Sequence, residues 1–270
     1  MGGFYKIPGT RPLKDLLHGT WPLRHPLHPA LTDVVVGGYV AVALLDALYL
    51  WQSDAALLRP TDAVLVLTLV FSLASILSGL TDWNDTYGNE RRLGILHGVL
   101  MTVVSLGSVW SLWVRVNGGG RETAIWLSFA LLVVLLVASH LGGEMVFGFG
   151  TGVDRQAWAR VPAKWTRIDV VASALEDRKP VRARAGSFDV MIVKLDGDLV
   201  AMGAACTHAS GPLEKGTFVG RDRRDIQCPL HASVFSLRNG AALHGPATID
   251  EPMLETRAAD DGYLEVRAHG

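Results

Sequence analysis

Four long apolar stretches occupy the first half of the chain, and short polar segments separate them. They cover residues 31–51, 63–80, 93–114 and 124–146. A helix rises about 1.5 Å per residue, so about 20 apolar residues cross the hydrocarbon core of a bilayer. The connecting segments are short and carry the charged, Gly and Asn residues that end helices. We therefore expect a membrane α-helical bundle of four transmembrane helices, with both ends on one side.

A different pattern fills the C-terminal part of the chain, where apolar and polar positions alternate in short runs. Residues 188–195 alternate, 196–198 read Asp-Gly-Asp, and 199–204 form the returning apolar run. Asn239-Gly240 and the Asp-Asp-Gly at 260–262 are further turn signals. This pattern predicts a small all-β domain built from antiparallel strands.

These patterns divide the chain into four segments. We expect an N-terminal surface segment at 1–30, a transmembrane domain at 31–147, an interfacial linker at 148–165 and the β-domain at 166–270. The first segment lacks the apolar core and cleavage site of a signal peptide, and Trp21 is a candidate interfacial anchor.

The composition agrees with a membrane protein. Hydrophobic residues make up 49% of the chain, charged residues 19%, and the mean hydropathy is +0.27. These values exclude an ordinary cytosolic protein, and a formal net charge of −1 gives no sign of a nucleic-acid partner.

Lysine and arginine are unevenly divided between the two sides of the predicted bundle. Positive residues favour the cytoplasmic side, so we expect both termini and the β-domain to be cytoplasmic. The residues on the side of the termini are Lys6, Arg11, Lys14, Arg24, Arg91, Arg92, Arg155, Arg160, Lys164 and Arg167, and those on the opposite side are Arg59, Arg115 and Arg121.

The two cysteines of the chain each lie close to a histidine. The motifs are Cys206-x-His208 and Cys228-x-x-His231. Two thiolates and two imidazoles form a four-ligand set for a soft metal, either a [2Fe-2S] cluster with differentiated irons or a structural zinc. Zinc sites usually take both cysteines from one half of the motif, whereas here each half supplies one of each. This favours the cluster over zinc, and over two buried thiols with no metal.

The residues around these ligands resemble the Rieske family over about residues 165–268. The resemblance implies that Cys206 and Cys228 bind the buried iron, and that His208 and His231 bind the exposed one. It also implies that neighbouring residues shape the ligand loops and a covering proline loop. These residues are Thr207, Gly211, Pro212, Leu213, Pro229, Ala232, Ser233, Gly245 and Pro246.

Departures from the pattern place the domain nearer to Rieske-type ferredoxins. Rieske proteins of cytochrome bc complexes carry two further cysteines that form a disulfide, whereas this chain has Leu230 in the second loop and no third cysteine. Ser233 matches a hydroxyl that hydrogen-bonds a cluster sulfur, and Phe235 replaces a tyrosine. Losing one donor to the sulfurs predicts an intermediate to low reduction potential.

Polar residues in the membrane half give a second set of candidates. Ionisable groups inside a bilayer are costly, so each is a functional hypothesis. Alternating helix directions place them all on the side of the termini. They are compatible with haem b, with His97 and His140 as the favoured pair, with a quinone or proton site, with another metal, or with a structural polar network. The residues are His25, His28, Asp82, Asp85, His97, His140 and Glu144.

Residues 20–150 also resemble a bacterial four-helix membrane family of unknown function, some members of which are fused to Rieske domains. The similarity lies in the HPLHP, TDWNDTYG, LHG and SHLGGE motifs. It implies a multi-pass protein of the bacterial inner (plasma) membrane.

The two halves together predict a membrane-anchored Rieske-type electron-transfer protein. It would pass single electrons between a soluble partner and a membrane redox partner, haem or quinone. The alternatives are a redox sensor, or a membrane-anchored ferredoxin subunit of a larger oxidoreductase or oxygenase complex. We expect an electron-transfer component rather than a complete enzyme, in contact with the bilayer and assembled as a homo-oligomer or in a larger complex.

Overall fold

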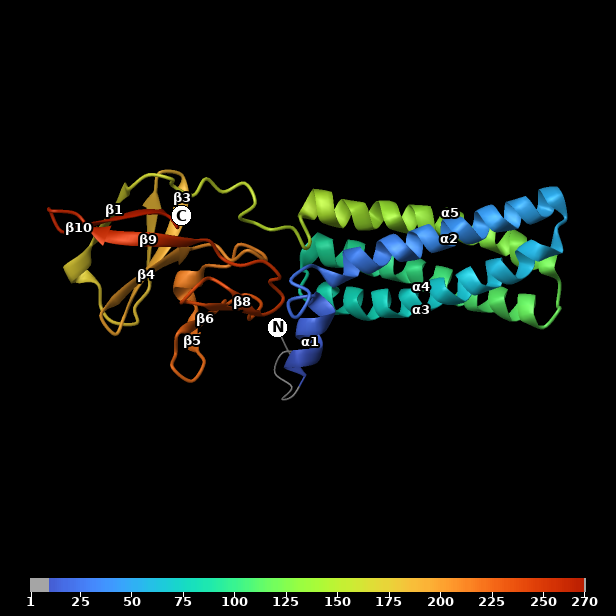
Figure 1. The fold of residues 1–270 in the computed structure, drawn as a ribbon, viewed down its shortest axis with the longest axis horizontal. Coiled ribbons are helices and arrows are strands. Elements are labelled where there is room, and N and C mark those ends of the chain that lie inside the picture. Colours follow the sequence, from blue (N-terminus) through green and yellow to red (C-terminus); the bar gives the residue numbers. More distant parts are fainter. Residues whose placement is uncertain (1–9, 270) are drawn as a thin grey trace. The chain divides into compact units, whose positions relative to one another are not determined.

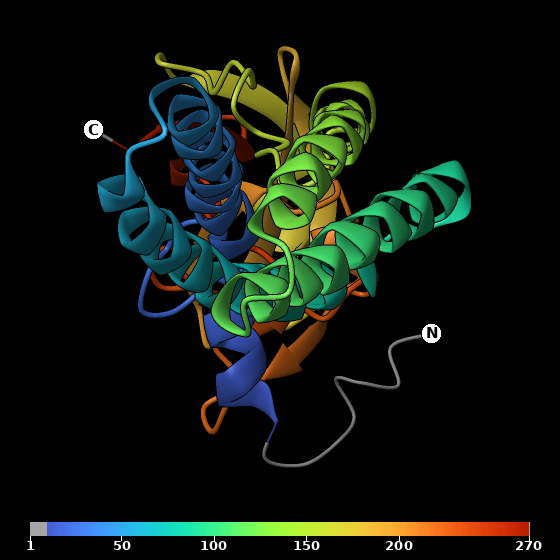
Figure 2. The same cartoon turned by 90° about the vertical axis from the view of Figure 1, so that its right-hand side faces the viewer.

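The structure is a computed structural model that describes residues 10–269. The chain divides into two compact units (Figures 1 and 2). Residues 26–152 form a helical unit, and of the described residues 10–25 join 153–269 in a β-unit. We expected residues 1–30 to form a segment of their own, but the part as far as His25 groups with the β-unit.

The helical unit contains four long helices, and Figure 2 looks along them. Each is long and apolar enough to cross a membrane, as the sequence predicts. Helix α2 packs against α3 and α5, and α4 packs against α3 and α5, so α2 and α4 lie diagonally across the bundle. The elements are α2 (Leu27–Gln52), η2 (Ala55–Leu57), α3 (Leu58–Trp83), α4 (Gly88–Val116), α5 (Arg121–Glu144) and the π-helical turn η3 (Met145–Phe149).

The bundle hides small hydroxyl residues inside and exposes large apolar ones. Exposed side chains such as Leu44, Val70 and Leu106 form an outer surface suited to lipid. The interior stripe of α3 contains Thr61, Thr68, Ser72, Ser75, Ser78 and Thr81. Most of these hydroxyls donate to the carbonyl one turn earlier, which satisfies them and lets the helices approach closely.

A buried ion pair ties three of the helices together. The Arg115 guanidinium on α4 donates through both terminal nitrogens to the Asp46 carboxylate on α2, and one of these nitrogens also donates to Ser128 Oγ on α5 at 3.0 Å. Both charged side chains are almost completely buried. A second pair joins Arg121 Nη1 to Asp62 Oδ2 at 2.9 Å. These contacts neutralise the charges that would otherwise be costly inside the bundle.

The β-unit consists of two antiparallel sheets and one short helix (Figure 1). The larger sheet has the order β1-β10-β9-β4-β3-β2, and the smaller has the order β5-β6-β7-β8. The elements are α1 (Arg11–His18), β1 (Thr166–Val171), η4 (Ala172–Ala174), β2 (Val181–Ala185), β3 (Phe188–Leu195), β4 (Asp198–Gly203), η5 (Leu213–Lys215), β5 (Thr217–Val219), β6 (Asp225–Gln227), β7 (Val234–Ser236), β8 (Ala242–His244), β9 (Met253–Ala258) and β10 (Tyr263–Ala268).

The predicted hairpin between β3 and β4 is confirmed. Leu195 pairs with Asp198 across a two-residue turn. Asp196 and Gly197 have φ values of 54° and 98°, as a type I′ turn requires of both central residues. The predicted turn between the last two strands is also confirmed, and Gly262 there has a φ of 83°.

Candidate metal centre

The first ligand loop is a tight turn closed by backbone hydrogen bonds. The amide of Cys206 donates to the Gly211 carbonyl at 2.9 Å, and the amide of Ser210 donates to the Cys206 carbonyl at 2.8 Å. Ser210 adopts a φ of 56° to make this turn. A β-bridge between Ala205 and Pro212 closes the base of the loop.

The second ligand loop repeats the same construction. The amide of Cys228 donates to the Ser233 carbonyl at 2.8 Å, and the amide of Ala232 donates to the Cys228 carbonyl at 3.1 Å. Ala232 adopts a φ of 65°. In both loops the residue four positions after the cysteine is left-handed, so two copies of one backbone motif present the ligands.

The fold brings together like donors from the two loops. The rings of His208 and His231 lie edge to face with centres 4.9 Å apart. The thiols of Cys206 and Cys228 are hydrogen-bonded to each other, and both cysteines are buried. Each sequence motif supplies one cysteine and one histidine, whereas the structure pairs cysteine with cysteine and histidine with histidine. A cluster with two sulfur ligands on one iron and two imidazoles on the other needs this arrangement.

The electrostatics of the donors suit metal binding. Burial, reinforced by neighbouring His231, lowers the pKa of His208 to about 3, and burial lowers the pKa of His231. Both rings are therefore neutral at physiological pH and keep a lone pair. The hydrogen bond between the thiols raises the pKa of Cys206 and lowers that of Cys228 to about 7. Neutral imidazole and thiolate are the forms that ligate metals, so both rings and Cys228 are suited to binding, whereas Cys206 would release its proton on binding.

Three further observations test whether a cluster fits. Nδ1 of His208 is buried and has no hydrogen-bond partner in the described part of the chain. A Cβ at Gly211 would lie 2.5 Å from Cys228 Sγ, so glycine leaves the space beside the thiol clear. Within residues 10–269, no three His, Cys, Asp or Glu side chains converge as ligands of a single metal ion would. The four donors, arranged in pairs, fit a [2Fe-2S] cluster.

Other residues expected around the cluster line the same loops. Ser233 is buried, and its Oγ accepts from the Ala247 amide at 3.0 Å, which leaves the hydroxyl proton to donate elsewhere. Phe235 is fully buried in the core that also contains both cysteines. Pro246 is buried as well, in the loop after β8. These positions agree with a shielded site.

A buried carboxyl supports the first loop. Glu251 is 2% exposed, and its Oε1 accepts from the Thr207 amide at 2.6 Å. The Thr207 hydroxyl donates to the Ile249 carbonyl at 2.9 Å, which joins the ligand loop to the same segment. Burial raises the pKa of Glu251 to about 8. No sequence pattern indicates this role, because Glu251 lies 45 positions after Cys206 with no recognisable spacing.

The N-terminal helix α1 packs against the proline loop. Asp15 Oδ1 accepts from the Gly245 amide at 3.0 Å, and Oδ2 lies 2.8 Å from His244 Nδ1. The Thr20 hydroxyl donates to the Ala247 carbonyl at 2.9 Å. His244, which lies in no ligand motif, is half-buried and paired with Asp15. The cause is a helix more than 200 positions away in sequence.

His18, at the end of the same helix, lies near the histidine side of the site. His18 is 3% exposed. Its Cβ and Cδ2 atoms lie 3.4 Å from the position that a Cβ at Gly245 would occupy, so the side chain packs beside the proline loop. Its proximity adds to the lowering of the pKa of His208, after the larger effects of burial and His231. A local signal for this helix exists in Pro12 near its start and Gly19 directly after its end, but neither indicates what the helix covers.

The candidates in the membrane half separate into two groups. His28 and His97 come together, with ring centres 6.4 Å apart. The others do not join a common site of that kind in the described structure. His140 and Glu144 lie on the exposed side of α5, so the favoured pairing of His97 with His140 is not the one observed. Asp82 and Asp85 lie at the α3–α4 turn, and His25 is an exposed residue of the β-unit.

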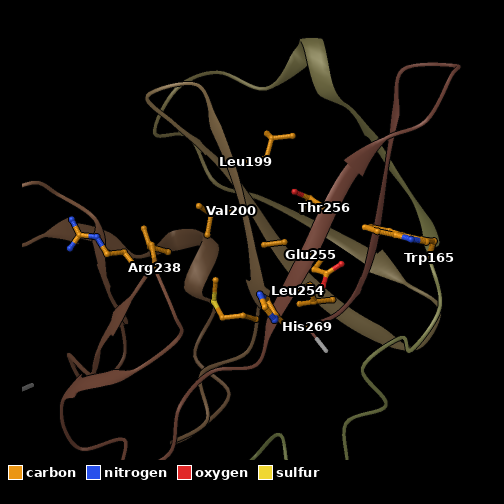
Figure 3. A pocket seen from close by; sticks show the side chains of 11 residues that line it. Trp165, Leu199, Val200, Arg238, Leu254, Glu255, Thr256 and His269 are labelled. Carbon is orange, nitrogen blue, oxygen red and sulfur yellow. The ribbon is translucent and has the colours of Figure 1, made fainter.

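A surface hollow lies elsewhere in the β-unit, beside β4 and β9 (Figure 3). None of the four metal ligands is among the residues that line it. At its edge, the guanidinium carbons of Arg257 and Arg267 lie 4.3 and 4.6 Å from the centre of the Trp165 ring. Trp165 is thus held by cation–π contacts within the β-unit. The lining residues are Trp165, Leu199, Val200, Ala201, Leu237, Arg238, Met253, Leu254, Glu255, Thr256 and His269.

Two family models match the chain, one for each half. The model described as "Predicted membrane protein (DUF2231)" matches residues 24–155, and that of the Rieske [2Fe-2S] domain matches residues 164–255. The chain is 32% identical to sulredoxin of Sulfurisphaera tokodaii over 82 residues, which are 30% of this chain and 72% of that protein.

Dioxygenase ferredoxins are also similar. The chain is 35% identical over 60 residues to the 3-phenylpropionate/cinnamic acid dioxygenase ferredoxin subunit of Photorhabdus laumondii, and these residues are 22% of this chain and 55% of that relative. It thus spans about half the length of that relative. Among solved structures, the ferredoxin of carbazole 1,9a-dioxygenase from Nocardioides aromaticivorans IC177 has 22% identity and a TM-score of 0.35, covering 40% of this chain and 100% of that one.

The residues at the paired loops and the family matches agree. Cys206, His208, Cys228 and His231 all lie within the matched range 164–255. The four apolar helices lie within the range matched by the membrane family. The chain therefore belongs to the Rieske [2Fe-2S] family, with its iron–sulfur domain joined to a predicted membrane domain of the DUF2231 family.

Proposed function

We propose that this protein passes single electrons between a soluble partner and a redox partner in the membrane, haem or quinone. The observation that carries the proposal is the pairing of Cys206 with Cys228 and of His208 with His231 in a chain that also has four membrane-length helices. When bound, the cluster supplies a centre that takes up and gives back one electron.

The chain's own residues fit this role by holding and screening the site. Leu213, Phe235 and Ala247 pack in the core that contains the two cysteines, and they keep water from the sulfur side. The imidazole side belongs to His208 and His231, which the similarity to Rieske domains assigns to the outer iron. Electrons would therefore exchange at the histidine side, where α1 and the proline loop also lie.

We also propose that the β-unit is cytoplasmic, at the inner membrane of a bacterium. Ten lysines and arginines flank the spans on the side of the termini, and three lie on the opposite side. One of these three, Arg115, is buried inside the bundle. The positive-inside tendency counts Lys and Arg near the ends of the spans, and it assigns the richer side to the cytoplasm.

A second candidate function is favoured by the relatives. Several are named as ferredoxin components of dioxygenase systems. By that similarity, the protein would be a membrane-anchored ferredoxin subunit of a larger oxidoreductase or oxygenase complex. A redox sensor is the third alternative, since a cluster that changes state without turnover would report on the cell's redox poise.

The test follows electrons through the full-length protein in liposomes that contain a quinone. NADH and a soluble flavin-containing ferredoxin reductase serve as the donor outside. We expect NADH oxidation to continue well beyond one electron per chain, and to require the cluster. If NADH oxidation stops after one electron per chain and leaves the cluster reduced, the proposed electron transfer to the membrane is wrong and a redox sensor is supported. Equal rates for wild type and Cys206→Ser would also overturn it.

A further inference from the structure

Two histidines from diagonally opposed helices meet inside the helical unit. His28 lies in the first turn of α2, and His97 lies in α4. Their ring centres are 6.4 Å apart with the ring planes at 88°. The rings form an edge-to-face pair, at a separation that two imidazoles bound to one shared atom would also have.

His28 is held against the neighbouring helix of its own hairpin. Its Nδ1 lies 2.9 Å from the carbonyl oxygen of Ser75 on α3, with the hydroxyls of Ser75 and Ser78 at 3.3 and 3.5 Å. The ring rests on Gly79, where a Cβ would lie 2.7 Å from its Cε1. Any side chain at Gly79 would displace the ring.

His97 is held in the same way by the second hairpin. Its Nδ1 lies 2.8 Å from the carbonyl oxygen of Ala138 on α5, and a Cβ at Gly142 would lie 3.3 Å from its Cε1. In both hairpins the accepting carbonyl precedes the glycine by four residues. The helical unit thus contains two copies of one arrangement, each presenting an imidazole.

These contacts fix which ring nitrogen carries the proton. A carbonyl oxygen only accepts, so Nδ1 of each neutral ring donates to it and the lone pair lies on Nε2. Within the described residues, the hydrogen bonds of His28 and His97 all involve Nδ1. A ring N–H given to a backbone carbonyl is the usual support of a metal-bound histidine, because it fixes the tautomer and the orientation.

The separation of the rings agrees with a shared metal. With a metal–nitrogen bond of about 2.0 Å and a ring centre about 1.1 Å beyond the nitrogen, two rings on opposite sides of one metal have centres about 6 Å apart. A lone ion in a protein site takes three or four protein ligands. No third His, Cys, Asp or Glu joins the pair in residues 10–269. Haem needs only two, because the porphyrin supplies the other four.

From these observations we propose that His28 and His97 are the two axial ligands of a b-type haem in the membrane domain. The haem iron would cycle between Fe(III) and Fe(II) by taking one electron and passing it on. Its role as the membrane partner of the cluster rests on the proposed function, whereas the binding site rests on the helical unit alone.

The test uses full-length protein, produced with a haem precursor and purified in detergent. We expect about one non-covalent haem per chain by pyridine haemochrome assay, with a low-spin bis-imidazole spectrum. His97→Ala should abolish haem binding. The matched control His140→Ala, on the exposed side of α5, should retain it. Equal haem loss in both variants would overturn the assignment.

Substitutions at two glycines test the position of the His28 ring without changing either histidine. Gly79→Ala crowds the His28 ring, and we expect added haemin to bind about 10–100-fold more weakly, as when the support of a metal ligand is disturbed. Gly37→Ala on α2 meets nothing within 4 Å and should bind as wild type does. Equal affinities for the two variants would contradict the geometry.

Other cofactors are distinguishable in the same sample. Protein with an intact iron–sulfur signal that neither carries haem nor binds added haemin would overturn this inference and leave the proposed function standing. Copper or zinc at one per chain that is lost in His97→Ala, or a co-purifying quinone in place of haem, would also overturn it. Loss of the cluster signal with haem retained would instead count against the proposed function.

Discussion

The cluster loops and the histidine pair of the bundle each consist of two copies of one local arrangement. The copies are short loops in the β-unit and helical hairpins in the helical unit. In the β-unit, two short loops repeat one backbone hydrogen-bond pattern, and the ligands lie within three residues of each other in each loop. In the helical unit, two helical hairpins repeat one contact between a histidine and the next helix, and His28 and His97 lie far apart in the chain. Each pair of donors comes from two copies of one local arrangement. Only the cluster loops are recognisable as motifs in the sequence, because their ligands are near neighbours in the chain.

The largest expected effect comes from breaking one of the cluster loops. Cys206→Ser removes a ligand that no other cysteine can replace, so iron and the [2Fe-2S] paramagnetic signal should fall to background while the helical unit stays folded. Metal analysis, electron paramagnetic resonance and circular dichroism measure these quantities. His244→Ala, outside the ligand set, should keep the signal. A cluster that survives in Cys206→Ser would show that the ligand assignment is wrong.

The buried ion pair is the corresponding weak point of the helical unit. Asp46→Asn removes the carboxylate that Arg115 binds through both terminal nitrogens and leaves only the longer contact of Arg115 Nη1 with Asp62 Oδ1, at 3.7 Å. Breaking a buried pair by removing one partner costs about 3–5 kcal/mol, and the contact with Asp62 places the expected loss at the lower end of this range. Thermal unfolding of the bundle in detergent should shift strongly downward. Asp33→Asn is the matched control, since Asp33 is exposed on the same helix. Equal stability of the two variants would show that the ion pair does not hold the helices together.

The support of the first loop should make the stability of the β-unit depend on pH. Glu251 has a pKa of about 8 in the folded chain and an ordinary value of 4.5, so the folded state binds its proton more tightly. Its contribution to stability is complete below pH 4.5 and is lost as the pH rises toward 8. Between about pH 6 and pH 8, the free energy of unfolding should fall by roughly 2–3 kcal/mol.

Glu251→Gln should flatten this pH dependence, because glutamine does not titrate. Denaturant midpoints of the two proteins at both ends of the range measure it. Glu176→Gln, at a largely exposed carboxyl, should keep the slope of the wild type. A wild-type slope that Glu251→Gln leaves unchanged would assign the titration to another group.

A smaller effect is expected from crowding the cluster loop. Gly211→Ala places a Cβ 2.5 Å from Cys228 Sγ, and overpacking of this kind costs about 1–3 kcal/mol. Cluster occupancy should fall together with stability. Gly262→Ala is strained only by its φ of 83° and has no neighbour within 4 Å, so it should lose stability and keep the cluster. Equal cluster occupancy in both variants would contradict the close approach of the Gly211 backbone to Cys228 Sγ.

Much of the molecule follows from local patterns. Apolar length predicts the four helices, turn chemistry predicts the hairpin at Asp196-Gly197, and spacing predicts the ligands. In each case the signal lies within a few neighbouring residues.

Contacts between distant segments were not predictable. The sequence favoured His97 with His140 as the pair of ligands, but helix rotation turns His140 outward and brings His28 to His97. The burial of Asp15 against Gly245 and the place of Glu251 under Thr207 depend on tertiary packing as well. No local periodicity contains such information.

The most direct test of the central claim is a reductive titration of the full-length protein with metal and sulfide analysis on the same sample. The four paired ligands predict two irons and two acid-labile sulfides for the cluster of each chain, and uptake of one electron that produces the [2Fe-2S] paramagnetic signal. Zinc at one per chain without labile sulfide, or iron that accepts no electron, would contradict the assignment of this protein to electron transfer.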